Sequence, residues 1–523
     1  MKDRLLDVLA LPGRKEPTAY LEDLIESRIE IHDSQHFEVK LDYSIDPHRK
    51  KNRYRVEMFL FSPLSLGVTP DTYSKKRFYT DIQAYIRFKT PAVPLAALLN
   101  PEDPDSPLAR LAAALPPLAS RRPGAQAVEG LESDMKLLGC LVRSHVRDRV
   151  AWCCRALRNL GGERMAEDLR SEAMRLVEEL AATLHRFRGL RAHLLDAGLP
   201  ARLRETHEFV DEYLSLSTEA FLTRLLQELD QGEAGAGYAD LRRILADQLG
   251  GEHRYRGEAG YPTLSSQGDR SHFLWRRGLL KKFTMSVLFL EITKSREGNR
   301  LLDLFAAIAA GVSMAIATMG GFWAQQRFLN STWPLLAALV LLYMVKDRTK
   351  EWLRSFFSKE MTRMLADWDV RIRDPRRGLD LGRCREAFGF LRREQVPPEV
   401  WAMRHQQART SIEALGKPEV VIKYEKEVSL DGRNVEKLGG PRQELSDIIR
   451  FNLAGFLTQA DDPTTPVTVY DPSRDRVETV DCPKVYHLNA IFVLHAEGNL
   501  QRSLEHVRVV LDKRGIQALE HYT

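Results

Sequence analysis

Two long stretches of the sequence contain no charged side chain. The first covers residues 304–324 and the second residues 328–345, and Arg327 is the only charged residue between them. A helix needs about 20 apolar residues to cross the hydrocarbon core of a bilayer. The first stretch is long enough, and the second only just, because polar residues and Pro334 weaken its start. The pattern predicts a transmembrane helical hairpin over residues 301–346; the alternative is a buried hairpin of a soluble protein.

Basic residues gather on both sides of this predicted hairpin. Lys and Arg concentrate in cytoplasmic loops beside membrane helices, so we expect both flanks and both termini in the cytoplasm. The composition, rich in Arg, Leu and Ala, favours a bacterial inner membrane. The bilayer with its anionic lipids would then be a partner. The basic side chains expected to face lipid are Arg276, Arg277, Lys281, Lys282, Lys346, Arg348 and Lys350.

Small residues recur every four positions in the first stretch, at Ala307, Gly311 and Ala315. This spacing lets two helices approach closely in a membrane. We expect these residues to pack on the second helix or on another copy of the chain, although an Ala-rich helix also produces such spacings by chance. Asp303, at the edge of the stretch, is expected at the interface with water.

Strict alternation of apolar and polar residues marks the N-terminal part, residues 1–90. Positions 37–45 alternate, residues 54–61 resume the pattern after a polar loop, and residues 82–88 give a third strand. We expect the first two strands to form a long-looped hairpin. The C-terminal part, residues 416–523, is predicted to be α+β. Its expected strands cover residues 419–426, 467–470, 486–495 and 505–511, with a helix near 444–457 and a hairpin turn at 512–515.

The middle of the chain follows a helical period. After a Pro-rich linker over residues 91–129, apolar residues recur at steps of three and four through 130–250, with a helix end expected at Gly161-Gly162. This predicts a three- or four-helix bundle or coiled coil, which would offer a face to protein partners. Residues 251–300 are assigned to a polar loop and a basic juxtamembrane segment. Residues 347–415 are assigned to juxtamembrane helices, including 383–393 and 399–413.

These patterns together predict an α+β membrane protein. It would have a two-helix transmembrane hairpin, a helical-bundle insert, and a cytoplasmic β-rich domain built from the N- and C-terminal segments. The last point depends on topology alone, because a hairpin returns both ends of the chain to the same side of the membrane.

Composition narrows the classes of function. Hydrophobic residues make up 44% and charged residues 28%, which excludes a mainly disordered chain. The mean hydropathy of −0.33 argues against a polytopic transporter, and the net charge of +5 is too small for a genome-coating protein. The five cysteines follow no disulfide or zinc spacing, which favours a reducing compartment.

Signatures of chemistry are scarce. The sequence contains no phosphate-binding loop, no dinucleotide fingerprint and no nucleophile elbow. His207 and Asp211 resemble half of a zinc-protease helix, but one His cannot hold catalytic zinc alone. Two basic clusters, residues 48–53 and the arginines Arg371, Arg373, Arg376 and Arg377, are interpreted as solvated, with anionic lipid as the next reading. The sequence therefore predicts no cofactor, metal or catalytic residue, and disfavours nucleic acid as a partner.

The favoured hypothesis is a hairpin-anchored inner-membrane scaffold that self-assembles or docks protein partners, with a homo-oligomer expected. One alternative is a membrane-bound enzyme whose cytoplasmic active site is discontinuous in sequence. Another is an oligomeric channel or transport accessory, which two nearly charge-free helices support poorly.

Overall fold

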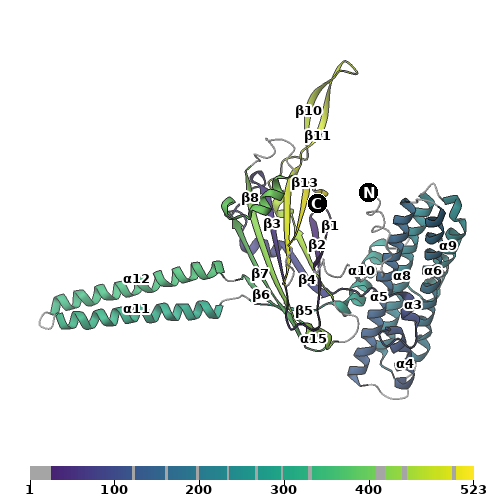
Figure 1. Ribbon diagram of the computed structural model, residues 1–523, viewed down its shortest axis with the longest axis horizontal. Coiled ribbons are helices and arrows are strands. Elements are labelled where there is room, and N and C mark those ends of the chain that lie inside the picture. The colour runs from purple at the N-terminus through teal and green to yellow at the C-terminus, as the bar shows by residue number, and fades with distance from the viewer. Residues whose placement is uncertain are drawn as a thin grey trace. The chain divides into compact units, whose positions relative to one another are not determined.

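The computed structural model divides the chain into two compact units, a helical unit and a β-sandwich unit (Figure 1). The helical unit consists mainly of residues 87–289, and the β-sandwich unit of the described parts of residues 24–86, 290–437 and 445–523. The structure describes residues 25–119, 124–159, 163–195, 199–231, 235–264, 269–295, 299–327, 332–364, 366–406, 418–438, 444–497 and 502–522.

Long amphipathic helices build the helical unit. Helix α5 buries Leu138, Val142, Val146, Val150 and Cys153, which recur at steps of three and four on one face. It packs most extensively on α8. The helices of this unit are α3 (Leu95–Leu99), α4 (Pro107–Ala119), α5 (Ala125–Arg158), α6 (Glu163–Gly189), α7 (Arg191–Leu194), α8 (Ala201–Gln231), α9 (Ala239–Glu258) and α10 (Arg270–Met285).

A buried ion-pair network fastens three of these helices together. Arg188 on α6 contacts Asp211 on α8 at 2.9 Å and Glu252 on α9 at 2.8 Å. The hydroxyls of Tyr255 and Tyr261 also donate hydrogen bonds to Asp211, at 2.5 and 3.1 Å. Because each buried charge has a partner, the network fixes how the helices pack instead of leaving a costly unpaired charge.

The expected boundaries in this region need two corrections. Residues 250–258, assigned to a loop, continue helix α9, which buries Glu252 and Arg256 in the bundle. The Pro-rich stretch is not purely a linker, because it contains α3 and α4, and α5 begins inside it at Ala125. The helix end expected at Gly161-Gly162 lies outside the described residues.

The β-sandwich unit is built on an eight-stranded sheet in which every neighbouring pair is antiparallel. Its strands, in spatial order, are β14 (Gly515–Tyr522), β13 (Ser503–Asp512), β12 (Tyr486–Ala496), β3 (Asn52–Pro63), β8 (Glu419–Leu430), β7 (Asp380–Leu391), β6 (Trp368–Arg373) and β5 (Glu291–Ser295). N-terminal β3 thus lies between two strands from the C-terminal third of the chain.

A four-stranded sheet covers the inner face of the large sheet. Its strands, in spatial order, are β1 (Ile25–Ile31), β2 (His36–Ser44), β9 (Glu444–Asn452) and β4 (Ile82–Phe88). Phe37, Val39 and Leu41 of β2 face Val56 and Met58 of β3 across the core. The hairpin expected between β2 and β3 is therefore wrong: the two strands belong to different sheets and bury their apolar faces against each other.

Two segments that were predicted to be helices are strands. The helix expected over residues 383–393 is wrong, because residues 383–391 lie in β7, where Cys384, Glu386 and Phe388 are buried and alternate with exposed Arg383 and Arg385. Residues 444–452 form β9, and only the short α16 (Ala454–Leu457) follows it. The expected turn at 512–515 is confirmed, with Asp512 paired to Gly515. A separate two-stranded arm, β10 (Thr464–Asp471) with β11 (Arg476–Pro483), completes the strands.

A helical hairpin is inserted between the paired strands β5 and β6, of which β5 is the edge strand of the large sheet. Helices α11 (Asn299–Arg327) and α12 (Thr332–Met364) lie side by side (Figure 1). They meet through small residues: Ala309, Ser313 and Ala324 are buried, and a Cβ atom on Gly320 would come within 2.4 Å of Leu342. The α+β class is confirmed, whereas only α11 has the length and composition of a membrane span among the described residues.

A buried charge cluster joins the two sheets inside the sandwich. Lys426 on β8 contacts Asp447 on β9 at 2.5 Å and lies 3.7 Å from Glu386 on β7. The hydroxyl of Tyr43 donates a hydrogen bond to Asp447 at 3.2 Å. Burial is the main cause that raises the pKa of Tyr43 well above its usual range, so the phenol stays protonated and able to donate.

We predict that Asp447→Ala destabilises the protein by about 3–5 kcal/mol, because it leaves the Lys426 ammonium buried without its nearest counter-charge. Urea unfolding of the full chain in mild detergent, followed by circular dichroism, measures this loss. The matched control is Asp462→Ala, which removes a surface ion pair with Lys513. The Asp462 side chain is 86% exposed. The control should cost less than about 1 kcal/mol; equal losses in the two variants would contradict the prediction.

Candidate functional sites

The surface of the α11–α12 hairpin is apolar on nearly all sides. In α11 only 11% of the most apolar window is buried. Among the described residues up to Val345, sixteen large apolar side chains of the two helices are each more than 40% exposed, including Trp323 at 64% and Trp333 at 80%. The helices therefore contribute no side chains to a core beyond their mutual contact.

The small-residue stripe of α11 lies on a different face from its partner helix. Ala307, Gly311 and Ala315 are exposed, and nothing lies within 4 Å of a Cβ atom built on Gly311. The contact with α12 uses Ala309 and Ser313 instead. The structure thus leaves the stripe open within one copy of the chain. The side chain of Asp303 lies outside the described part of the structure.

The basic residues expected to face lipid fall into different environments. Arg276 on α10 forms an ion pair with Glu212 at 2.6 Å, so it stabilises the helical unit. Its neighbours Arg277, Lys281 and Lys282 are exposed. On α12, Lys346 lies over the ring of Tyr343 at 4.5 Å. Two others on that helix are exposed: Arg348, which pairs with Glu351 at 3.6 Å, and Lys350.

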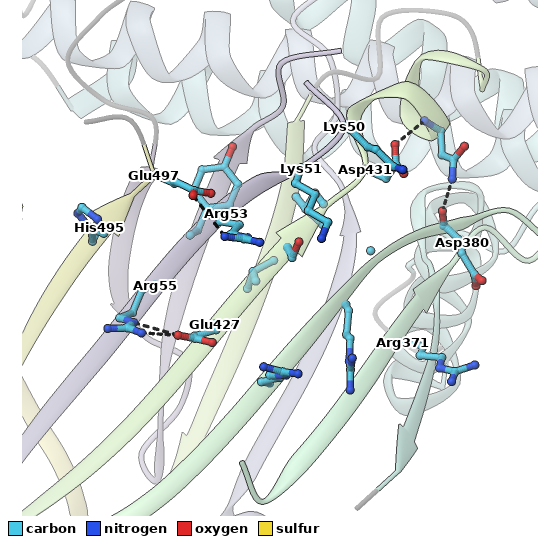
Figure 2. A pocket seen from close by; sticks show the side chains of 18 residues that line it. Lys50, Lys51, Arg53, Arg55, Arg371, Asp380, Glu427, Asp431, His495 and Glu497 are labelled. Atoms are coloured by element: carbon cyan, nitrogen blue, oxygen red, sulfur yellow. Dashed lines mark hydrogen bonds and ion pairs between the residues drawn. The ribbon is translucent and has the colours of Figure 1, made fainter. Parts of the chain in front are cut away.

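A second candidate site is a concave, basic area on the outer face of the eight-stranded sheet, which we call the basic basin (Figure 2). It encloses about 890 Å³, a volume typical of pockets for small molecules. Among the described residues that line it, seven are Lys or Arg and four are Asp or Glu, a net charge of +3. Its side chains come from β12, β3, β8, β7, β6, the loops at their ends and the short helix α15 (Gly432–Glu436).

Strand register places the cations of the basin in a row. Arg53 on β3 lies opposite Ser429 on β8, Ser429 lies opposite Arg383 on β7, and Arg383 lies opposite Arg371 on β6. In the next row, Arg55, Glu427 and Arg385 are aligned in the same way. Like charges directly opposite each other destabilise a sheet.

Acidic neighbours offset part of this charge. Arg53 pairs with Glu497 at 3.3 Å and Arg55 hydrogen-bonds Glu427 (Figure 2). Arg383 hydrogen-bonds Asp369. Asp380, at the rim, accepts a hydrogen bond from Arg373, which is the main cause that lowers the pKa of Asp380. Arg371 contributes to the same lowering through its charge.

The loop that carries Lys50 and Lys51 is held in place by backbone contacts. Asn52 and Asp46 exchange two hydrogen bonds, of 3.1 and 3.2 Å, which close the loop. The loop then rests on the start of α15 (Gly432–Glu436), where the amide of Gly432 donates to the carbonyl of Arg49 at 3.2 Å. A Cβ atom on Gly432 would lie 2.1 Å from the Asp46 oxygen, so only glycine fits there.

The structure therefore brings together parts of two basic clusters that are more than 300 residues apart in sequence. Lys50, Lys51 and Arg53 come from the first, and Arg371 from the second. The other arginines of the second cluster make structural contacts instead: Arg376 lies 3.7 Å from Asp374, and Arg377 hydrogen-bonds the carbonyl of Lys437. Sequence reasoning missed Arg383 and Arg385, because it placed them in a helix.

The described residues offer no metal-binding set. No group of three or more His, Cys, Asp or Glu side chains within them could hold a metal ion. His207 is buried, stacks on the Phe187 ring at 4.3 Å, and lies 2.9 Å from the Phe187 carbonyl. Burial lowers the pKa of His207, so it is a neutral core residue. Asp211, its supposed zinc-helix partner, belongs to the ion-pair network of Arg188.

Comparisons with protein family models, curated proteins and solved structures find no match to this chain.

We predict that Gly432→Ala loosens the loop that carries Lys50 and Lys51. The added methyl group meets backbone oxygens, which forces a shift that costs about 1–3 kcal/mol. Trypsin should then cleave after Arg49, Lys50 or Lys51 about 10-fold faster, because local opening governs proteolysis. Gly389→Ala on β7 is the control, since nothing lies within 4 Å of its Cβ position. Unchanged cleavage in Gly432→Ala would refute the assigned contact.

Proposed function

We propose that the protein is a membrane-anchored docking protein, with the α11–α12 hairpin as its anchor and the β-sandwich unit as its docking body. The observation that carries the proposal is the exposed apolar surface of the hairpin. Transfer of its sixteen exposed side chains from water into hydrocarbon would contribute on the order of 20 kcal/mol. A soluble protein would bury such helices in its core.

The proposal includes both helices as spans. The apolar part of α12 that the structure describes covers residues 332–345 and is too short alone, so the proposed span also uses residues 328–331. Exposed Trp323 and Trp333 suit the water interface at the closed end of the hairpin. A two-span anchor would place both termini on one side, and the positive flanks favour the cytoplasmic side. The composition, rich in Arg, Leu and Ala, favours a cell with an inner membrane.

Docking is favoured over catalysis by the character of the basic basin. Cations and their acidic partners line it, and no group of three or more His, Cys, Asp or Glu side chains among the described residues could hold a catalytic metal ion. Self-assembly is supported by the open stripe of Ala307, Gly311 and Ala315, which a second hairpin would be able to cover in the membrane. We therefore also propose that the protein forms a homo-oligomer and that the helical unit offers a second surface to protein partners.

Single-cysteine labelling in intact cells tests the anchor. In a Cys482→Ser background, which removes the one exposed thiol among the described cysteines, we expect a cysteine at Arg327 to react with a membrane-impermeant maleimide added outside. A cysteine at Lys350 should react only after the cells are opened.

A control cysteine at Arg243, whose side chain is 85% exposed on α9, should also stay protected in intact cells. External labelling at Lys350 but not at Arg243 would mean that α11 alone spans the membrane. No external labelling at Arg327, together with release of the protein by alkaline carbonate, would reject the anchor altogether.

A further inference from the structure

We propose that the basic basin binds an anion that carries two or more phosphate groups. This inference goes beyond membrane anchoring and does not rest on it, because every residue of the basin belongs to the β-sandwich unit.

The first argument is the cost of the row formed by Arg53, Arg383 and Arg371. Neighbouring strands are about 4.8 Å apart, so Arg383 and Arg371 project side by side from adjacent strands. Such an arrangement opposes sheet formation. Asp369 offsets the charge of Arg383, and an anion shared between the two guanidinium groups would offset the charge that remains. Ser429, between Arg53 and Arg383, adds a neutral hydroxyl that is able to donate to the same anion.

The second argument is the state of the two lysines at the rim. Lys50 and Lys51 are exposed, and within the described part of the chain neither has an ion pair or a hydrogen bond from its side chain. Their loop is nevertheless fixed by Asn52 and Gly432, so the ammonium groups are held at the mouth of the basin. Figure 2 shows both lysines on the same side as Arg53, with Arg371 across from them.

The span of the row determines how many phosphate groups the ligand needs. Arg53 and Arg371 are separated by three strand intervals, or about 14 Å between their backbones. One phosphate group is able to meet the adjacent guanidinium groups of Arg383 and Arg371, but not Arg53 and the lysines as well. A chain of phosphate groups would reach all of them, and the volume of about 890 Å³ accommodates it.

The lining also indicates which part of the ligand is recognised. Tyr54 and His495 are the only aromatic rings among the described lining residues. The Tyr54 ring packs against Tyr43 at 5.0 Å, and its hydroxyl hydrogen-bonds the carbonyl of Ser44, so it offers no open face for a base. Single-stranded nucleic acids are bound through such stacking faces. His495, which is half-buried, is the one ring left among the described lining residues, so the phosphate groups supply most of the recognition.

Titration calorimetry of the full-length protein in mild detergent tests the proposal, with sodium triphosphate and orthophosphate as probes. Triphosphate should bind in a saturable manner, at least ~10-fold tighter than orthophosphate, and more weakly as salt is raised. Arg371→Gln and Arg383→Gln should each weaken triphosphate binding ~10- to 100-fold, since each removes a charge-assisted hydrogen bond.

Two further variants separate loss of the site from misfolding and from nonspecific binding of the anion to surface cations. Lys50→Gln combined with Lys51→Gln alters only exposed side chains and should also weaken triphosphate binding. Arg28→Gln is the matched control, because Arg28 is a 69% exposed arginine on β1 of the other sheet, and it should bind triphosphate as the wild type does. Equal weakening in Arg28→Gln, equal affinity for orthophosphate, or no saturable binding would overturn the proposal.

The source of the phosphate groups is resolved by reconstitution into nanodiscs. If a lipid with a diphosphate headgroup blocks triphosphate binding, the ligand class is supported and the bilayer supplies it. If binding in such nanodiscs equals that in nanodiscs of neutral lipid, the class is supported and the ligand is water-soluble. Tight binding of a single-stranded oligonucleotide without any binding of triphosphate would instead replace the proposal with a nucleic-acid surface. None of these results depends on the topology of the hairpin.

Discussion

The pairing of β3 on both of its edges is the constraint on which the β-sandwich unit depends. Residues Asn52–Pro63 hydrogen-bond to β12 along one edge and to β8 along the other, over most of their length. The side chains of one face enter the core between the two sheets. On the other face Arg53 and Arg55 line the basin, whereas Phe59 and Phe61 are buried in a second apolar cluster with Val396 and Val400. Because β3 comes from the N-terminal part and its neighbours from the C-terminal third, the helical unit and the hairpin are insertions into one sheet.

Sequence periodicity located the long helices and half of the strands, but not which strands are neighbours in the sheets. Strict alternation identified β2, β3 and β4, and steps of three and four identified the long helices, since both patterns follow from one buried face. The prediction that β2 pairs with β3 was wrong, because a short polar loop is able to connect two strands of one sheet or to cross from one sheet to the other. Only the complementary apolar faces, buried against each other, decide between these outcomes, and a local pattern does not contain them.

The misassignment of β7 has a different physical cause. Its buried positions include Cys384 and Glu386, and Glu386 faces Lys426, so a charged residue occupies a core position that a hydrophobic pattern marks as exposed. The same error hid two of the seven cations that line the basic basin. Lys50, Lys51 and Arg53 were recognisable as a basic run, but Arg383 and Arg385 become their neighbours only through the register of β7 on β8. A site formed by register across several strands leaves no spacing signature in one sequence.

The central position of β3 also imposes an order on synthesis. Both strands that flank β3 are translated after residues 299–364, so the apolar hairpin leaves the ribosome while β3 still lacks partners on its two edges. Unpaired edges of this kind are open to pairing with other chains, and distant contacts form slowly. The nascent chain must therefore keep its N-terminal strands apart from other molecules until β8 and β12 arrive. Truncation anywhere before β8 would leave a chain that is able to make its helices but not its sandwich.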